Sequence, residues 1–319
     1  MKPALFFLCL ASASLTWAAD YPEARITNGP VKATILLPDA GHGYYRGTRF
    51  DWSGAIASLE YQGHNYFGKW FEKYDPKIHD AIMGPVEEFR TNDSALGYDE
   101  AKPGETFVKI GVGVLRKQDD PAYKFTTNFE IVNGGKWTYK SSPNQVQFKH
   151  ELTDASGYAY VYEKTVRLVK DKPQMIIEHR LKNTGKRTIE TSVYNHNFFV
   201  IDGQPSGPDF TVTFPFALQT VADVSNTAVA NGNKLTYVRE LPTGESVFTE
   251  LKGYGSTARD YDIRVENTRE KVGVHIVGDR PLSKLLFWSI RKTLCPEAYV
   301  SMKIDPGKTS EWKITYDFY

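Results

Sequence analysis

The sequence predicts an all-β protein that folds as one large sandwich of two packed, mainly antiparallel sheets. Apolar residues mostly alternate with polar ones in short runs, which is the period-two pattern of half-buried strands. Clusters of Gly, Pro, Asn and Asp separate these runs, and helical stripes are scarce. Because so many short strands cannot form one open sheet, we expect two sheets stacked face to face.

The strand pattern extends over most of the chain. The predicted strands are Val31–Leu37, Ala55–Tyr61, Thr106–Leu115, Phe125–Val132, Gln145–Leu152, Tyr158–Val169, Gln174–Lys182, Thr188–Val200, Thr211–Phe214, Lys234–Val238, Val247–Leu251, Tyr261–Glu266, Val272–Val277, Lys284–Trp288, Ala298–Ile304 and Ser310–Tyr316. Residues 38–54 and 62–105 are the least strand-like, and we expect long loops or short helices over one face there. Long loops in a compact domain are usually functional.

Composition and charge narrow the class of partner. The 319 residues carry 39 Lys and Arg against 38 Asp and Glu, which gives a net charge of +1. Such a balance predicts no nucleic-acid partner and no polybasic membrane patch. After the first twenty residues no apolar stretch is long enough to span a membrane as a helix. We therefore expect a small or neutral molecule as the partner.

The first residues have the order of a secretory signal. Lys2 precedes the apolar run Ala4–Leu10, and small residues follow up to Ala18 and Ala19. We expect residues 1–19 to be a signal peptide, the alternative being a buried N-terminal helix. Residues 20–319 would then form a single domain that is exported to the periplasm or the medium. Only Cys295 remains in that domain, so we expect no intramolecular disulfide.

A polar cluster between aromatic residues marks the end of the predicted strand Thr188–Val200. It reads Tyr-Asn-His-Asn-Phe-Phe at positions 194–199. Alternation places Tyr194, His196 and Phe198 on one face. Two aromatic rings beside a proton-transfer group are typical of a sugar pocket. A buried histidine satisfied by a backbone carbonyl is the alternative for His196.

Glu297 is the second candidate for chemistry. It directly follows Pro296 at the start of an apolar predicted strand. Burial there would raise its pKa toward the value that a general base needs near neutral pH. An exposed carboxylate at a strand end is the alternative.

The chain resembles the aldose 1-epimerases, or galactose mutarotases, in three ordered regions. Tyr158–Val200 is similar to the family's central strands, which lead into an Asn-His-x-Tyr-Phe motif, and positions 195–199 read Asn-His-Asn-Phe-Phe here. Residues 295–297 (Cys-Pro-Glu), followed by Pro-Gly at 306–307, are similar to the family's C-terminal glutamate and turn. Residues 54–59 resemble its opening Gly-Ala strand.

The resemblance implies a galactose mutarotase-like β-supersandwich that interconverts the anomers of a free sugar. His196 would be the general acid that protonates the ring oxygen, and Glu297 the general base that takes the proton of the anomeric hydroxyl. This chemistry needs no cofactor and no metal. The sequence agrees, because it has no His-Glu-x-x-His motif and its seven histidines are dispersed.

Five further residues are candidates for sugar binding. Arg49 offers forked donors that suit vicinal hydroxyls or a carboxylate, and His79 is the candidate for a second pocket histidine. Asn195 adjoins the catalytic candidate, Trp288 could stack on a sugar ring, and Asp209 follows in a nearby loop. Surface ion pairs, a buried tryptophan and a turn-forming aspartate are the corresponding alternatives.

Two other functions remain open at this point. The chain could be a binding protein that keeps the sugar cleft without catalysis, or a polysaccharide lyase or glycoside-processing enzyme on the same fold. The second would need an additional acid or a tyrosine at the cleft, and the chain has 19 tyrosines. In each case we expect a monomer that binds a mono- or oligosaccharide.

Overall fold

The protein is an all-β sandwich. The computed structural model describes residues 21–119 and 122–319, so the predicted signal peptide at 1–19 lies outside the described residues. Every strand pairing that it defines is antiparallel. No helix in these ranges is long and apolar enough to cross a membrane.

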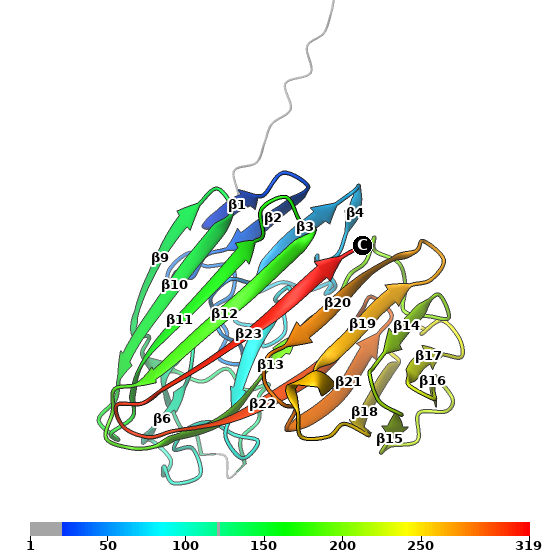
Figure 1. Ribbon diagram of the computed structural model, residues 1–319. Helices are drawn as coiled ribbons and strands as arrows, with labels where there is room; N and C mark the ends of the chain where they lie inside the picture. Colours follow the sequence, from blue (N-terminus) through cyan, green and yellow to red (C-terminus); the bar gives the residue numbers. More distant parts are fainter. Residues whose placement is uncertain (1–20, 120–121) are drawn as a thin grey trace, which may run out of the picture.

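A ten-stranded sheet forms the larger layer, and Figure 1 shows it as a continuous row from β9 to β16. Its strands, in spatial order, are β16 (Ala228–Asn231), β17 (Lys234–Tyr237), β14 (Phe210–Thr213), β19 (Asp262–Asn267), β20 (Val272–Gly278), β23 (Thr309–Phe318), β12 (Gln174–Asn183), β11 (Ala159–Leu168), β10 (Gln145–Thr153) and β9 (Lys136–Ser142). Buried residues alternate strictly with less buried ones along β12, as the sequence pattern predicts.

A six-stranded sheet packs against this layer. Its order is β15 (Gln219–Thr220), β18 (Ser246–Lys252), β21 (Lys284–Ile290), β22 (Thr293–Ile304), β13 (Ile189–His196) and β5 (Val86–Arg90). All residues from Thr293 to Val300 in β22 are buried, so both faces of this strand are covered. One face contacts the ten-stranded sheet, and loops cover the other.

Two smaller sheets complete the fold. One contains β1 (Glu23–Thr27), β2 (Val31–Leu36), β3 (Ile56–Tyr61) and β4 (His64–Asn65), and the other β6 (Thr106–Lys109), β7 (Gly113–Arg116) and β8 (Ile131–Asn133). A 3₁₀ turn spans Ala258–Asp260. The loop at 38–54 has no strand, as predicted, and Phe50 and Trp52 from it join Trp70 and Phe198 in a separate aromatic cluster.

The sandwich confirms the predicted fold class, and three local predictions are wrong. The loop-like stretch 62–105 contains β4 and β5. Of Phe125–Val132 only the end is a strand, because Phe129 instead packs into the aromatic cluster. Gly111 splits Thr106–Leu115 into β6 and β7, since it adopts a φ of +78° and a Cβ there would lie 2.8 Å from Asp51.

A buried polar network joins the two large sheets. Glu87 of β5 accepts hydrogen bonds from Lys164 of β11 and, at 2.9 Å, from Asn195 of β13. The Nε2 atom of His179 in β12 lies 2.8 Å from the same carboxylate. Burial alone would raise the pKa of Glu87, but Lys164 and His179 lower it to about 2. The carboxylate is therefore held charged inside the protein.

Replacing Glu87 by Gln should destabilise the fold strongly, because it removes the nearer of the two carboxylates beside the buried Lys164 ammonium and leaves only Asp51, 3.8 Å away. Breaking one partner of such a pair costs about 3–5 kcal/mol. Urea unfolding measures the loss. The matched control is Glu245→Gln, which breaks a partly exposed pair with Arg239 and should cost less than about 1 kcal/mol. Equal losses in the two variants would contradict the role given to Glu87.

Candidate active site

His196 and Glu297 are brought together by the register of two neighbouring strands. Val193 in β13 pairs with Val300 in β22. Because the strands are antiparallel, the same register three residues further along places His196 opposite Glu297. Directly opposed residues point to the same side of a sheet. We call this side of the six-stranded sheet the site face.

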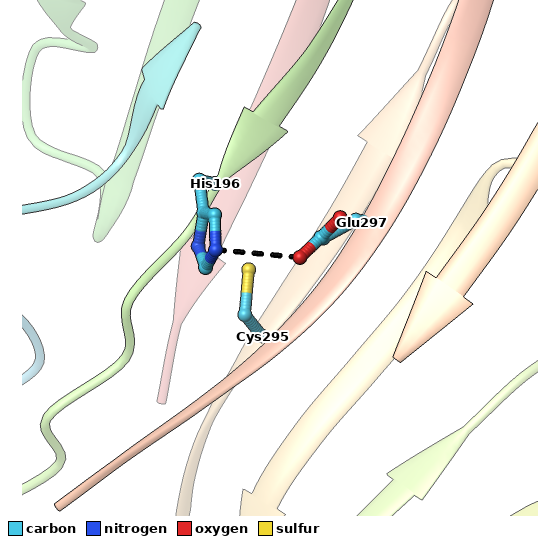
Figure 2. A group of neighbouring side chains, drawn as sticks. All are labelled: His196, Cys295 and Glu297. Atoms are coloured by element: carbon cyan, nitrogen blue, oxygen red, sulfur yellow. Dashed lines mark ion pairs between the residues drawn. The ribbon is translucent and has the colours of Figure 1, made fainter. Parts of the chain in front are cut away.

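The two side chains are in direct contact. His196 Nε2 lies 3.3 Å from Glu297 Oε1, and Figure 2 shows the imidazole and the carboxyl pointing toward each other. Their side chains are only 4% and 6% exposed. The two groups, about a hundred positions apart in the sequence, therefore meet in the fold, and their roles as acid and base stay a prediction.

Aromatic rings cover the pair. Phe198 stacks on the His196 imidazole at 3.7 Å between ring centroids, and Trp288 lies edge-on at 5.3 Å. Phe50, from the loop at 38–54, contacts the same imidazole edge-on at 5.7 Å. Trp70 stacks on Phe198 at 4.7 Å. This aromatic cover excludes water from the pair in the free protein.

The cover determines the protonation of the pair. Burial raises the pKa of Glu297 to about 7. Burial also lowers the pKa of His196 well below its usual value, and the nearby Arg49 charge adds to that effect. Near neutral pH the imidazole is therefore neutral and Glu297 is close to half protonated, so the protonated pair holds one transferable proton.

Cys295 lies two residues before Glu297 on the same face. An imidazole nitrogen of His196, the Cys295 sulfur and a Glu297 oxygen all lie within 4.8 Å of one another (Figure 2). Burial raises the pKa of the thiol, and the Asn197 N–H donates to its sulfur at 2.9 Å. By donor type these three side chains could hold a transition metal. The absence of a metal stays a prediction.

A charged cluster adjoins the pair on the site face. Arg49 Nε donates to Glu88 at 2.9 Å, and the Tyr194 hydroxyl donates to the same Glu88 oxygen at 2.7 Å. The other Glu88 oxygen accepts from Lys109 Nζ at 3.2 Å. Tyr194 stacks on Tyr299 with ring centroids 4.2 Å apart. Burial alone would raise the pKa of Glu88, but Lys109 and Arg49 hold it far below its usual value.

Known proteins resemble the chain in fold but not in sequence. No family model and no curated relative match it. The GalM/aldose epimerase homologue from C. elegans superposes with a TM-score of 0.57 over 94% of this chain and 99% of its own, at 14% identity. A galactose mutarotase-like protein from Clostridium acetobutylicum gives 0.56 over 92% and 94%, at 14% identity. The Slr1438 protein from Synechocystis sp. PCC 6803 gives 0.56 over 96% and 99%, at 13% identity.

The chain has the galactose mutarotase-like fold. This confirms the architecture that the sequence resemblance implies. At these identities the likeness shows the fold alone, so the chemistry rests on the side chains of this chain.

Within the galactose mutarotase-like fold, the other predicted site residues lie in different places. Trp288 and Arg49 are near the His196–Glu297 pair. His79 is half-buried, and its ring lies 5.7 Å from that of Phe125, which also covers the Arg49 guanidinium. Asn195 lies on the opposite face in the Glu87 network. Asp209 is about half exposed beside Arg269 and is not brought together with the pair.

Several site residues were not assigned a role from sequence. Lys109 interrupts the apolar run Phe-Val-Lys-Ile-Gly-Val at 107–112, and two adjacent glutamates interrupt Gly-Pro-Val-Glu-Glu-Phe at 84–89. Charges inside apolar runs are rarely buried unless they are paired, so these interruptions were the available signal for Lys109 and Glu88. Tyr299 gave no such signal.

Replacing Glu297 by Gln should make stability less dependent on pH. The ordinary pKa of this carboxyl is 4.5, and in the folded protein it is about 7. As pH rises between these values, the unfolded chain releases the proton and the folded protein retains it, so wild-type stability falls. A shift of one pKa unit corresponds to about 1.4 kcal/mol. The free energy of unfolding of the variant, relative to that of the wild type, should therefore rise by about 3 kcal/mol between pH 4 and pH 8.

Urea unfolding at both pH values measures this gain. Glu163→Gln, which removes a carboxylate that is 42% exposed and paired with Arg180, is the control and should show no such gain. A Glu297→Gln effect of equal size at pH 4 and pH 8 would contradict the raised pKa.

Proposed function

We propose that the protein is an aldose 1-epimerase-like isomerase that interconverts the anomers of a sugar. The observation that supports this most directly is the 3.3 Å contact between His196 and Glu297 on one face of a sheet. An acid and a base that share one proton are the two groups that the reaction needs. The galactose mutarotase-like fold adds support, because solved structures named as aldose epimerase homologues share it.

The reaction moves two protons and breaks one bond. One group gives a proton to the ring oxygen while the other takes the proton of the anomeric hydroxyl, and the bond between the anomeric carbon and the ring oxygen breaks. Rotation of the open-chain aldehyde and reclosure give the other anomer, with both protons returned. By resemblance His196 is the acid and Glu297 the base. In the free protein burial favours the proton on Glu297. Transfer of this proton to His196 gives the protonated imidazole and the carboxylate that these roles require.

The resemblance implies an acid and a base on either side of the anomeric centre, and the arrangement of the pair differs from this. His196 and Glu297 lie side by side on one face instead of on opposite sides of a ring-sized gap. This still suits the substrate, because the ring oxygen and the anomeric oxygen are bonded to the same carbon. A sugar placed over the pair would replace the direct contact with two hydrogen bonds. Phe50 and Trp288 must move aside for it to enter.

Tyrosine chemistry is disfavoured at this site. A lyase would need a tyrosinate or a tyrosine close to deprotonation, but burial raises the pKa of both Tyr194 and Tyr299. The neighbouring carboxylates Glu88 and Glu297 raise it further. This observation favours the isomerase over the lyase alternative. The next measurement distinguishes the isomerase from a binding protein without catalysis.

His196→Ala and Glu297→Gln should each slow anomer interconversion by about 100-fold or more, because each removes one proton transfer. Polarimetry on freshly dissolved α-galactose and α-glucose measures the rate. His275→Gln is the matched histidine control, since His275 pairs with Asp262 in the ten-stranded sheet. Glu163→Gln is the carboxylate control. A wild-type rate no faster than buffer would leave only the binding function, and unchanged rates in both site variants would refute the assigned pair.

We further propose that residues 1–19 direct export and are removed, and that residues 20–319 act as a monomer on a carbohydrate in the periplasm or the medium. Loss of Lys2 would leave 38 basic and 38 acidic side chains, a neutral mature chain. When the full chain is expressed with its leader, intact mass should match cleavage near Ala18 or Ala19. Size-exclusion chromatography with light scattering should give the mass of one chain. Retention of residues 1–19 would contradict export by this signal.

A further inference from the structure

The site face continues from the buried pair into an open groove. Beyond the Tyr194 and Tyr299 row, Ser192 pairs with Arg90 on one side and with Ser301 on the other. The next pair on this face is Glu190 and Lys303. Arg90, Ser192, Ser301, Glu190 and Lys303 line a groove of about 430 Å³. A volume in this range suits a small ligand.

Arg90 connects the groove with the pair. Its row lies four residues along the strands from the row of His196 and Glu297, about 13 Å at 3.3 Å per residue. The long Arg90 side chain shortens this gap. Its charge lowers the pKa of both Glu297 and Tyr299. One sugar with a substituent at the far end of its ring can therefore reach from the pair toward Arg90.

The buried part of the site has more cations than carboxylates. Arg49, Arg90 and Lys109 face the buried carboxylates Glu88 and Glu297, and Arg90 also lies 3.7 Å from Asp93, whose side chain is 75% exposed and screened by solvent. The excess is one positive charge if Glu297 is ionised and two if it is protonated. A buried charge without a counterion is unfavourable. A ligand with a negative charge would therefore be favoured in this site over a neutral one of the same shape.

The rim of the site does not cancel this excess. Lys284 and Asp93 approach each other at 3.9 Å, and their charges offset one another. Asp80 lies beside His79 and is about one third exposed, so solvent screens it. The charges at the rim therefore do not offset the excess positive charge of Arg49, Arg90 and Lys109.

The Arg90 guanidinium retains donors for such a ligand. Its Nη2 atom donates to the Asp93 backbone carbonyl at 2.7 Å, and its side chain is 16% exposed. Its Nε atom is buried without a partner among the described residues. A guanidinium has five N–H donors, and its planar fork matches a carboxylate or a phosphate.

We propose that the substrate is a sugar with an acidic group, whose anion binds at Arg90 in the groove while its anomeric end lies at His196 and Glu297. This inference rests on the proposed isomerase activity and adds the class of substrate to it. The acidic group is a carboxylate, as in a uronic acid, or a phosphate, and both would use the same donors.

Matched sugars test the proposal on the wild-type protein. Anomer exchange is measured for galactose against galacturonate and for glucose against glucuronate, with galactose 6-phosphate to separate phosphate from carboxylate. One charge-assisted contact is worth about 10- to 100-fold, so kcat/KM for at least one acidic sugar should exceed that of its neutral counterpart by about this factor. Added salt should reduce the advantage.

Arg90→Gln tests the residue. It should raise KM for the preferred acidic sugar by about tenfold or more, and by clearly more than it changes KM for the matched neutral sugar. Arg116→Gln is the control, since that arginine pairs with Glu130 in an exposed position. A thermal unfolding scan establishes that each variant is folded, and the wild-type comparison stands without any variant.

The outcomes separate this inference from the function on which it rests. Neutral sugars turned over as fast as acidic ones, with His196→Ala inactive, would overturn the acidic substrate and leave the isomerase intact. An Arg90→Gln variant that slows both classes equally would also overturn it. A wild-type protein that accelerates no sugar would overturn both.

Discussion

Two adjacent buried glutamates in one edge strand organise the site. Because alternate residues in a strand point to opposite faces, Glu87 projects into the space between the two large sheets and Glu88 projects onto the site face. Lys164 offsets the charge of the first and His179 contacts its carboxylate, while Arg49 and Lys109 offset the charge of the second. Burying an ionised carboxylate is unfavourable unless it is paired. The position of β5 therefore links the core of the sandwich to the charges that surround the candidate active site.

Much of the fold could be predicted from sequence, because strand alternation is a local signal. The paired strands β10, β11 and β12 match their predicted segments within two residues. The edge strand β5 could not be found in this way, since its acidic residues are buried on both faces and break the apolar pattern. Their partners come from strands and loops far away in the sequence. Pairing between charges that are far apart in the sequence produces no periodic pattern along the chain, so it cannot be recognised from the sequence.

The candidate site could be predicted in part, and the roles of its residues stay a prediction. Resemblance identified His196 and Glu297, and strand register explains why they meet. Sequence could not show that the pair is buried, because part of its cover is Phe50, which comes from a loop without regular structure and packs against the His196 ring. Asn195 illustrates the same limit. Its neighbour His196 lies on the site face, whereas Asn195 points into the core, and an assignment by proximity in sequence ignores the alternation of the strand.

The aromatic cover has a kinetic consequence. If a ligand engages the pair only after Phe50 and Trp288 have moved, the measured affinity equals the intrinsic affinity multiplied by the open fraction. If opening is slow, association becomes independent of ligand concentration at high concentration. The same closure keeps bulk water from competing for the shared proton between turnovers. Selectivity and speed in this protein would thus both depend on how easily two rings leave their resting positions.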